Sequence, residues 1–493
     1  MFTDATIEEI NQHMEAAFNA FMVYRKVSLK QRAGLMRAIA AEIENLGDAL
    51  LQTAGKETNL PEARLRNERG RTVFQLQSYA DACERGDWLE ASIDTADLNR
   101  NPPKPDIRKM LVPLGPVVVF GAANFPFAYS TAGGDTATAL AAGCSVIVKA
   151  HPAHPATSDM VASAISKAVA SCKLPAAVFT HVHGASVEVG QALVKHPRTA
   201  AVGFTGSLAG GKALYDAAVS RPVPIPVFAE MSSINPVFLL PGKIKTSAAE
   251  TAKLYAGSIT LGAGQFCTNP GLIIAIDDEH TKKFLEILAE EIRESVPAKM
   301  LHAGIYRNYV SKQEQLLSQK GVLELSRSTF TAADMQGTPA IAVSDAATFI
   351  SNPVLHQEVF GPLSLIILCK DIVEMEKVSE KAEGQLTVTL MATDNDILQN
   401  PSLINKLSLV CGRFILNSVP TGVEVCLSMQ HGGPYPATTD SRFTAVGAGA
   451  IKRFARPQSF QNWPDALLPE ELKNANPAGV PRTVNNTWTK NPL

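Results

Sequence analysis

A cysteine in a glycine-rich segment is the first residue of this sequence whose type and surroundings suit chemistry. Cys267 lies in ITLGAGQFCTNPG (259–271), between a predicted helix and a predicted strand, and its small neighbours let a ligand approach the backbone closely. The thiolate is the reactive form of cysteine, so a catalytic cysteine needs an exposed, polar or electropositive site. Context alone leaves two interpretations open, a nucleophile and an ordinary loop cysteine.

The other six cysteines carry weaker signals. Those in apolar runs or helical patterns are Cys83, Cys144, Cys172 and Cys369. Their context favours inert packing thiols, whereas that of Cys411 and Cys426 is ambiguous. Because no spacing resembles CxxC or a zinc quartet, and a secreted disulfide framework would be shorter and denser, we predict reduced thiols, no metal site and a cytoplasmic protein.

Three polar residues stand where apolar runs end. Glu230 ends PIPVFAE and is either solvated or a general base. Asn124 follows PVVVF and either donates to an oxyanion or is a turn residue beside Pro126. Lys149 ends SVIVK, where a charge either faces a ligand or reaches out to solvent.

A possible phosphate site follows the run TAAVGF, although the sequence lacks GxGxxG. Gly206 and Ser207 would place backbone N–H groups and a hydroxyl at the start of a helix, where unpaired donors and the helix dipole stabilise a phosphate. A plain capped strand-to-helix turn is the alternative.

The elements that must position these residues alternate in type from residue 110 onwards. Strands are predicted at 116–120, 145–150, 176–182, 199–206 and 224–230, with helices at 128–143, 157–172, 186–196 and 207–219. Apolar strands that alternate with helices indicate a parallel sheet covered on both faces, which binds ligands at the carboxyl ends of its strands. A second such series runs from 246 to 430. Its predicted helices are 246–261 and 281–294, and its predicted strands are 271–276, 364–369, 386–392 and 412–417.

The two ends of the chain have different patterns. The first 95 residues favour helices, among them 29–58, 60–83 and an amphipathic N-terminal helix capped by Thr3 or Asp4. The polar, proline-rich stretch 95–109 predicts a loop, and the tail from 455 is either a packed arm or partly disordered.

Targeting and membrane signals are weak. The N-terminus has neither the basic nor the apolar region of a signal peptide. The uncharged stretch 110–134 is long enough to span a bilayer, but its prolines and glycines predict a buried strand and a turn instead.

Composition limits the class of protein further. The 493 residues are 46% hydrophobic and 19% charged, which suits two to four domain-sized units with large cores. The 45 basic residues balance 47 acidic ones for a net charge of -2, so nucleic acid is not an expected partner.

Six blocks in one order resemble the NAD(P)-dependent aldehyde dehydrogenase superfamily over nearly the whole chain. They are PLGPVVVFGAANFPFA, CSVIVKAHPAHPATS, VGFTGSLAGG, FAEMSSINPVF, GQFCTNP and QEVFGPLSLI. The segments GGDTATALAAG, VKAHPAHP and VPTGVEV…HGGPYPATTD look most like the branch that oxidises 2-oxoglutarate semialdehyde (2,5-dioxovalerate), while a neighbouring branch acts on long-chain aldehydes.

The resemblance implies a role for each matching residue. Cys267 is the expected nucleophile, Glu230 the general base, and Asn124 an oxyanion donor together with the backbone N–H of Cys267. Expected contacts to the cofactor are Lys149 and His151 at the adenosine ribose, Gly206 and Ser207 at the pyrophosphate, and Glu358 and Phe360 at the nicotinamide riboside. His431, in QHGGPY, either borders the thiol and the substrate or is an ordinary loop histidine, and Phe125 is expected to border the substrate.

Two departures from the family pattern bear on these roles. The glycine pair usual after the base is replaced in Glu230-Met-Ser-Ser-Ile, which predicts a bulkier loop. Pro152 stands where NAD-preferring members often carry an acid, so repulsion against a 2′-phosphate is absent and His151 can add a donor. The expected cofactor is therefore NADP, with NAD as the alternative.

The resemblance also implies an α/β architecture with two Rossmann-like parallel-sheet domains and a small oligomerisation element. The expected dinucleotide-binding domain comprises 1–94 and 115–232, the catalytic domain 233–440, and a hairpin with a C-terminal arm 95–114 and 441–493. A homodimer or homotetramer is expected. Two rival hypotheses are an inactive binding or structural relative and a cysteine hydrolase that pairs the thiol with a histidine.

Overall fold

The computed structural model describes residues 2–493, and its first sheet is built from the strands of the first predicted series. They are β3 (Val117–Phe120), β4 (Val146–Lys149), β5 (Phe179–Val182), β6 (Ala201–Thr205) and β7 (Val227–Glu230). All pair in parallel in the order β5-β4-β3-β6-β7. Glu230, Lys149 and the loop that carries Asn124 therefore lie at the same edge of the sheet.

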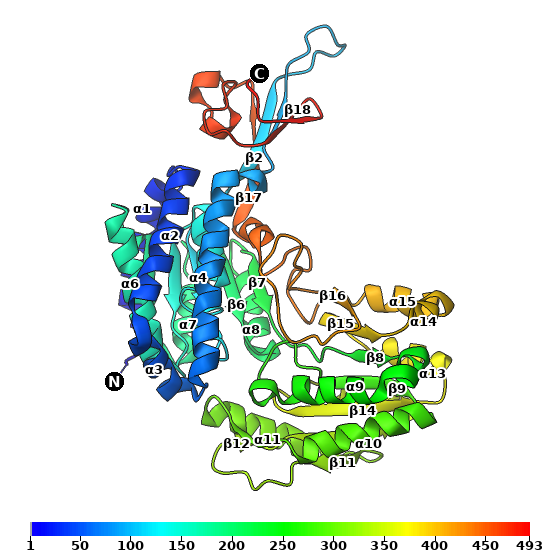
Figure 1. The fold of residues 1–493 in the computed structure, drawn as a ribbon. Helices are drawn as coiled ribbons and strands as arrows, with labels where there is room; N and C mark the ends of the chain where they lie inside the picture. Colours follow the sequence, from blue (N-terminus) through cyan, green and yellow to red (C-terminus); the bar gives the residue numbers. More distant parts are fainter. Residues whose placement is uncertain (1) are drawn as a thin grey trace.

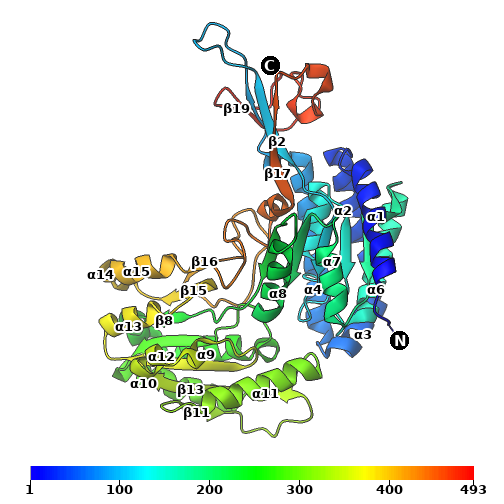
Figure 2. The same ribbon diagram turned by 180° about the vertical axis from the view of Figure 1, so that it is seen from behind.

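Helices cover both faces of this sheet (Figures 1 and 2). They are α1 (Ile7–Tyr24), α2 (Leu29–Asn45), α3 (Gly47–Thr58), α4 (Glu62–Arg85), α5 (Gly134–Ala142), α6 (Pro155–Ser171), α7 (Val187–Lys195) and α8 (Leu208–Val219). Alternate residues of β3 face opposite cores: Val117 and Val119 join the core beneath α2 and α4 to α6, while Val118 and Phe120 join that beneath α1, α7 and α8. This arrangement explains why the strand is apolar at every position.

The second series forms a seven-stranded sheet. Its strands are β8 (Val237–Leu239), β9 (Leu272–Ile276), β11 (Leu323–Arg327), β13 (Ala340–Asp345), β14 (Leu363–Cys369), β15 (Gln385–Met391) and β16 (Cys411–Leu416). The order is β11-β13-β14-β9-β8-β15-β16, and only the edge strand β11 is antiparallel to its neighbour. The three strands β8, β11 and β13 have no counterpart in the prediction from sequence.

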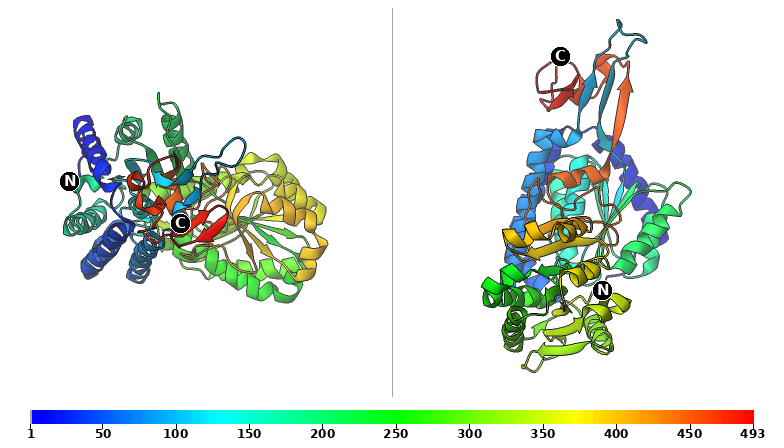
Figure 3. Two further views of the ribbon diagram at one scale, coloured as in Figure 1. Left: turned by 90° about the horizontal axis from the view of Figure 1, so that it is seen from above. Right: turned by 90° about the vertical axis from the view of Figure 1, so that its right-hand side faces the viewer.

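Helices also sandwich this second sheet, as the view from above in Figure 3 shows. They are α9 (Pro241–Thr260), α10 (Glu279–Arg293), α11 (Ala303–Leu317), α12 (Ala346–Ser351), α13 (Ile372–Ser379), α14 (Asp394–Gln399) and α15 (Pro401–Ser408). A separate short pair joins β10 (Ala298–Lys299) to β12 (Gln336–Gly337).

A third sheet projects from the body of the molecule (Figures 1 and 3). It consists of β1 (Ser92–Asp94), β2 (Ile107–Pro113), β17 (Ala455–Gln461), β18 (Arg482–Val484) and β19 (Thr487–Thr489), in the order β17-β2-β1-β18-β19. The stretch before residue 114 and the C-terminal tail, far apart in sequence, thus pair along β2 and β17. Of the two interpretations of the tail, the packed arm is the one observed.

Three local expectations need correction. The cap of α1 is Thr6 and not Thr3 or Asp4, because Glu9 completes a capping box with Thr6 while Asp4 accepts hydrogen bonds from the N–H groups of Ala185 and Ser186. The segment 29–58 is two helices that part at Leu46. The predicted helix 128–143 is helical only as α5, since residues 128–133 form turns beside the site.

The uncharged stretch 110–134 contains β2, β3 and these turns. Within residues 2–493, no helix is both long and apolar enough to cross a membrane.

Candidate active site

Three segments that are far apart in sequence bring their polar side chains together at the edge of the first sheet. Glu230 is the last residue of β7, Cys267 follows the short 3-10 helix η3 (Leu261–Gly264), and His431 comes from the long loop between β16 and β17. Nε2 of His431 lies 3.1 Å from Oε1 of Glu230 and 3.6 Å from Sγ of Cys267. Glu230 and His431 are both buried.

A single ring nitrogen of His431 faces both partners. In a nucleophile–histidine–carboxylate triad, by contrast, the carboxylate holds one ring nitrogen while the other takes the proton of the nucleophile. Nε2 cannot do both tasks at once, so His431 is placed to hold Glu230 and to border the thiol. The histidine that a cysteine hydrolase would need is present, but its geometry is not that of a relay.

Burial and charge act differently on the two groups. Burial, followed by the charge of Glu230, raises the pKa of the Cys267 thiol well above its ordinary value. Burial would also raise the pKa of Glu230, but His431, together with Cys267 and Arg453, holds that pKa below the usual value. In this state the carboxylate carries the charge and the thiol keeps its proton, so attack requires transfer of that proton to a base.

The turn before Cys267 has a backbone that its sequence explains. Gly262, Ala263 and Gly264 all have positive φ, at 56°, 56° and 65°. A Cβ on Gly264 would lie 2.2 Å from the backbone of Gly361, so only glycine lets the nucleophile turn pack against the EVFGP block.

Asn235, which the sequence analysis did not single out, holds the nucleophile loop in place. Its buried amide donates to the carbonyl groups of Cys267 and Asn269, each at 2.9 Å. Gln385 in turn accepts a 3.1 Å hydrogen bond from the backbone N–H of Asn235. An asparagine just before an apolar strand, in SSINPVF, was the available signal.

Asn124 lies beside the loop that carries Cys267. Its amide donates to the carbonyl of Gln265 at 3.1 Å, which leaves its second N–H free to reach an oxyanion near Cys267. Arg64 of α4, another residue missed from sequence, donates to the Asn124 carbonyl at 2.6 Å. The Arg64 guanidinium also packs on the rings of Phe125 and Phe266, 4.9 and 4.8 Å from their centroids.

Phe125 and Tyr129 lie beside the catalytic cluster, on the turns after β3. The ring of Phe125 meets those of Phe266 and Tyr129 edge-on, at 5.5 and 5.3 Å between centroids. The ring of Tyr129 lies 6.1 Å from that of His431. Tyr129 thus links Phe125 and His431, the two expected substrate residues.

Lys149 ends β4 and His151 lies two residues later, at the expected adenosine end of the site. Burial lowers the pKa of Lys149, while Asp4 acts in the opposite direction. Nδ1 of His151 accepts a hydrogen bond from Ala153 N–H at 3.1 Å, so the proton of the neutral ring resides on Nε2. Burial, with the nearby His154 and Lys149, lowers the pKa of His151 well below its ordinary value, so the ring offers a donor rather than a positive charge.

The start of α8 differs in one detail from expectation. Ser207 caps the helix by accepting from Gly210 N–H at 3.2 Å. The N–H of Gly206 donates to the carbonyl of Glu230 at 3.0 Å and is therefore not a free donor for a phosphate. Among residues 2–493, no acceptor is bound to the N–H groups of Leu208 and Ala209, which are the donors this helix end offers.

Glu358 and Phe360 lie on the segment that packs against the nucleophile turn and line a hollow with Ser233 and Gly264. Ser232 donates to Oε2 of Glu358 at 2.7 Å. Burial raises the pKa of Glu358 to about 7, opposed by the Ser232 hydrogen bond and the charge of Lys312. The first of the two serines that replace the family's glycines thus orients the expected ribose ligand.

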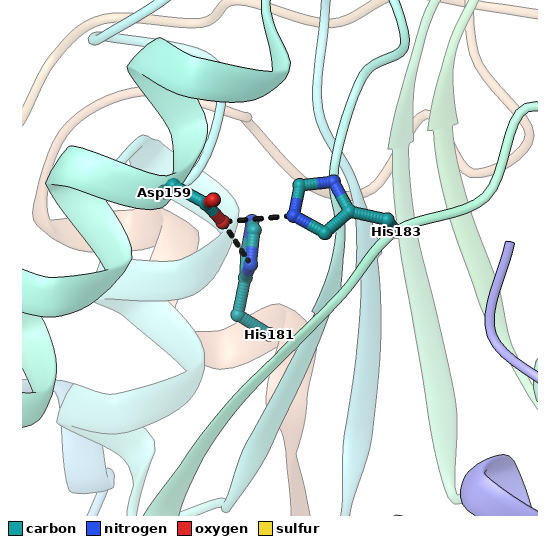
Figure 4. A group of neighbouring side chains, drawn as sticks. All are labelled: Asp159, His181 and His183. Atoms are coloured by element: carbon teal, nitrogen blue, oxygen red, sulfur yellow. Dashed lines mark hydrogen bonds and ion pairs between the residues drawn. The ribbon is translucent and has the colours of Figure 1, made fainter. Parts of the chain in front are cut away.

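A second cluster of ligand-type side chains lies at the edge strand β5. Figure 4 shows Asp159 of α6 facing both His181 of β5 and His183 just after β5, with N–O distances of 3.4 and 2.8 Å. Nε2 of His181 also pairs with Ser158 Oγ at 2.7 Å. These contacts connect α6 to the edge strand, and they explain why the three side chains lie together.

The remaining cysteines are all free thiols. Burial raises the pKa of Cys83 and Cys369 to about 12 and that of Cys144 and Cys411 to about 11. Because the pKa of Cys267 is raised as well, a raised pKa does not distinguish it from the other thiols. What distinguishes Cys267 is that Glu230 and His431 lie next to its thiol.

Comparison with known proteins identifies the class. The model of the aldehyde dehydrogenase family matches residues 1–434, and the chain belongs to this family. It is 44% identical over 493 residues to the alpha-ketoglutaric semialdehyde dehydrogenase of Acinetobacter baylyi, covering 100% of this chain and 93% of that relative. It is 48% identical over 483 residues to alpha-ketoglutaric semialdehyde dehydrogenase 2 of Azospirillum brasilense, covering 98% and 92%.

Solved structures show the same fold at low identity. Betaine aldehyde dehydrogenase of Staphylococcus aureus is 18% identical, with a TM-score of 0.79 and coverage of 93% of this chain and 89% of that chain. Glyceraldehyde-3-phosphate dehydrogenase GapN of Methanocaldococcus jannaschii, solved with NADP, is also 18% identical, with a TM-score of 0.78 and coverage of 93% and 95%. The protein is an aldehyde dehydrogenase, as its blocks predicted, and neither rival hypothesis is favoured.

Proposed function

We propose that the protein oxidises 2-oxoglutarate semialdehyde to 2-oxoglutarate. The two curated relatives that cover the chain almost fully carry this substrate in their names. At the level of residues, one observation carries the proposal: Cys267, Glu230 and Asn124 meet at one sheet edge. His431 contacts both Cys267 and Glu230, and Asn124 donates to the carbonyl of Gln265. A long-chain aldehyde, the alternative substrate, would require an apolar tunnel instead.

In the proposed reaction, Glu230 first takes the proton of the Cys267 thiol, and the sulfur attacks the aldehyde carbon. The free N–H of Asn124 and the backbone N–H of Cys267 stabilise the oxyanion that forms, an interaction whose loss typically costs roughly a hundred- to a thousandfold in rate. Bound NAD(P) would supply the hydride acceptor that converts this adduct into a thioester. Glu230 passes the first proton to solvent and, as a carboxylate again, takes a proton from the water that attacks the thioester. It returns that proton to the departing sulfur, so that the acid and the thiol are released.

The residues present fit a nicotinamide dinucleotide. Lys149 and the Nε2–H of His151 suit the adenosine ribose, the free N–H groups at the start of α8 suit the pyrophosphate, and Glu358 suits a ribose diol. We propose NADP as the preferred form, since Pro152 leaves no carboxylate to repel a 2′-phosphate.

We further propose that the domains divide as expected from sequence and that two or four copies of the chain assemble. We also propose that the protein resides in the cytoplasm. The third sheet supports the assembly because it projects from the body and exposes Trp463 and Trp488, half and two-thirds accessible. Seven free thiols suit a reducing compartment. Sedimentation velocity of the full chain tests the assembly, and a monomer at micromolar concentration would contradict it.

The function is tested by incubating the purified protein with 2-oxoglutarate semialdehyde and either NADP or NAD while following the absorbance of the reduced cofactor. The semialdehyde should be oxidised far faster than a long-chain aldehyde. Cys267→Ala should abolish turnover and leave cofactor binding intact, and turnover that persists in this variant would overturn the assignment of the nucleophile.

A further inference from the structure

Two arginines from different parts of the fold converge on one loop near the nucleophile. Arg413 of β16 donates to the carbonyls of Gly422 at 2.8 Å and Pro420 at 2.6 Å. Arg71 of α4 donates to the carbonyl of Val423 at 2.7 Å. The two guanidinium groups therefore bind carbonyls of one loop, 420–423, although the residues are separated by more than three hundred positions.

Both guanidinium groups retain unused donors. The Nε atoms of Arg71 and Arg413 are buried, and within residues 2–493 neither has a hydrogen-bond partner. Over the same residues neither side chain forms an ion pair with a carboxylate: Glu68, one turn before Arg71, instead accepts from the N–H groups of Phe127 and Ala128. A buried N–H without a partner is costly, and an anion is the acceptor that a guanidinium favours, so the two Nε–H groups could bind one.

Tyr129 connects the pair to the catalytic residues. Nη2 of Arg71 donates to the hydroxyl of Tyr129 at 3.2 Å, and its guanidinium lies 5.6 Å from the centroid of that ring, which in turn neighbours His431. Charge effects place both arginines within range of the thiol. Arg71 acts to lower the pKa of Cys267 against burial and Glu230, and Cys267 acts to raise the pKa of Arg413, which burial lowers.

We propose that Arg71 and Arg413 bind the carboxylate of the substrate, so that an aldehyde acid is held with its carboxylate at the two guanidiniums and its aldehyde carbon at Cys267. This inference rests on the proposed function and deepens it, because it assigns the residues that select an ω-oxo acid over an uncharged aldehyde. The planar fork of arginine suits a carboxylate, and two forks can occupy both of its oxygens.

Arg64 is the competing candidate, since its Nη1 is also buried without a partner. Its guanidinium packs on the rings of Phe125 and Phe266 and donates to the Asn124 carbonyl. These contacts make Arg64 a positioning residue for the oxyanion donor. Replacing it should slow the oxidation of charged and uncharged aldehydes alike.

The test compares 5-oxopentanoate, an aldehyde acid, with pentanal, an uncharged aldehyde of the same chain length. The wild type should have the higher kcat/KM for 5-oxopentanoate. Arg71→Met and Arg413→Met should each lower the ratio of the two kcat/KM values by roughly 10- to 100-fold, mainly through KM for the acid, because each removes hydrogen bonds to a charged group. Arg413→Lys should restore part of the ratio, since it keeps the charge and loses the fork.

The control is Arg456→Met, an exposed arginine of β17 that should leave the ratio unchanged. A ratio that stays at the wild-type value in both Arg71→Met and Arg413→Met would overturn the inference. A wild type that oxidises neither compound nor 2-oxoglutarate semialdehyde would instead overturn the proposed function, so the two failures are distinguishable.

A second measurement needs only the wild-type enzyme and applies even where a variant does not fold. With pentanal as substrate, glutarate should inhibit competitively at a concentration at least about 10-fold lower than glutaramide, which has the same length but no charge. Equal inhibition by the two compounds would contradict a carboxylate site at these arginines.

Discussion

Nε2 of His431 lies 3.1 Å from the carboxylate of Glu230, and both side chains are buried. The same nitrogen is 3.6 Å from Sγ of Cys267, so one imidazole edge lies against both the base and the nucleophile. His431 is the main reason that the pKa of Glu230 stays low in spite of burial, which makes Glu230 a carboxylate at neutral pH.

Replacing His431 by phenylalanine should move the pH dependence of turnover. Without the imidazole, burial dominates and the pKa of Glu230 rises, so the carboxylate becomes protonated at a higher pH and activity on the acid side is lost earlier. A kcat profile from pH 5 to 9 measures the shift. His431→Gln, which keeps a donor, should lie between wild type and phenylalanine; an unmoved acid limb in His431→Phe would contradict the coupling.

The cofactor-independent hydrolase predicts a different outcome. If the thiol worked through His431 as a relay, hydrolysis of a simple ester would depend on the histidine, and the oxidation rate would not depend on nicotinamide. We expect aldehyde oxidation to require NAD(P) strictly, as measured by acid formation with and without cofactor.

The hydrogen bond from Ser232 to Glu358 predicts a pH effect on cofactor binding. Burial raises the pKa of Glu358 to about 7, although the hydrogen bond from Ser232 acts to lower it. Ser232→Ala should therefore raise the pKa of Glu358 further and leave its carboxyl group protonated at neutral pH. A protonated carboxyl accepts ribose hydroxyls poorly, so cofactor affinity should fall several-fold at pH 7 and recover at higher pH. Fluorescence titration across pH measures this effect, with Ser408→Ala on the exposed end of α15 as the control.

Asn235→Ala should destabilise the protein. The change leaves the buried carbonyls of Cys267 and Asn269 without their donor, and it places alanine at a φ of 48°. Together these effects should lower the free energy of unfolding by about 2–4 kcal/mol. Urea unfolding measures the loss, and Asn405→Ala, at an exposed position of α15, should change stability by less than about 0.5 kcal/mol.

Pro152→Glu should shift the cofactor preference towards NAD. The new carboxylate, three positions after Lys149, would repel a 2′-phosphate, and a like-charge interaction of about 1–4 kcal/mol at close range corresponds to roughly five- to nearly a thousandfold in affinity. The ratio of kcat/KM for NADP to that for NAD measures the shift. An unchanged ratio would show that the 2′-phosphate binds elsewhere.

The placement of Glu230, Lys149 and Asn124 was predictable from sequence for one physical reason. Each follows an apolar strand, and parallel strands bring their carboxyl ends to the same edge of a sheet. The glycines around Cys267 likewise indicated a turn, and φ values of 56° and 65° at Gly262 and Gly264 are of the kind that glycine adopts readily.

Hydrogen bonds between side chains of distant segments could not be predicted from the sequence. Ser232 pairs with Glu358 across 126 positions, and Asn235 reaches Cys267 across 32. From sequence, Ser232 and Ser233 predicted only a bulkier loop, while the structure shows that the hydroxyl of Ser232 donates to a buried carboxylate, that of Glu358. No local pattern encodes such contacts, because they depend on how two sheets pack.

What the sequence by itself determined is the alternation of strands and helices in the first sheet, the residues at the ends of those strands and the membership in the aldehyde dehydrogenase family. Tertiary structure alone decided that one nitrogen of His431 faces both Glu230 and Cys267, that the Gly206 N–H is already occupied, and that Arg71 and Arg413 share a loop. Local propensity and periodicity act over a few residues, whereas charge, burial and hydrogen bonding in a site depend on groups that only the folded chain brings together.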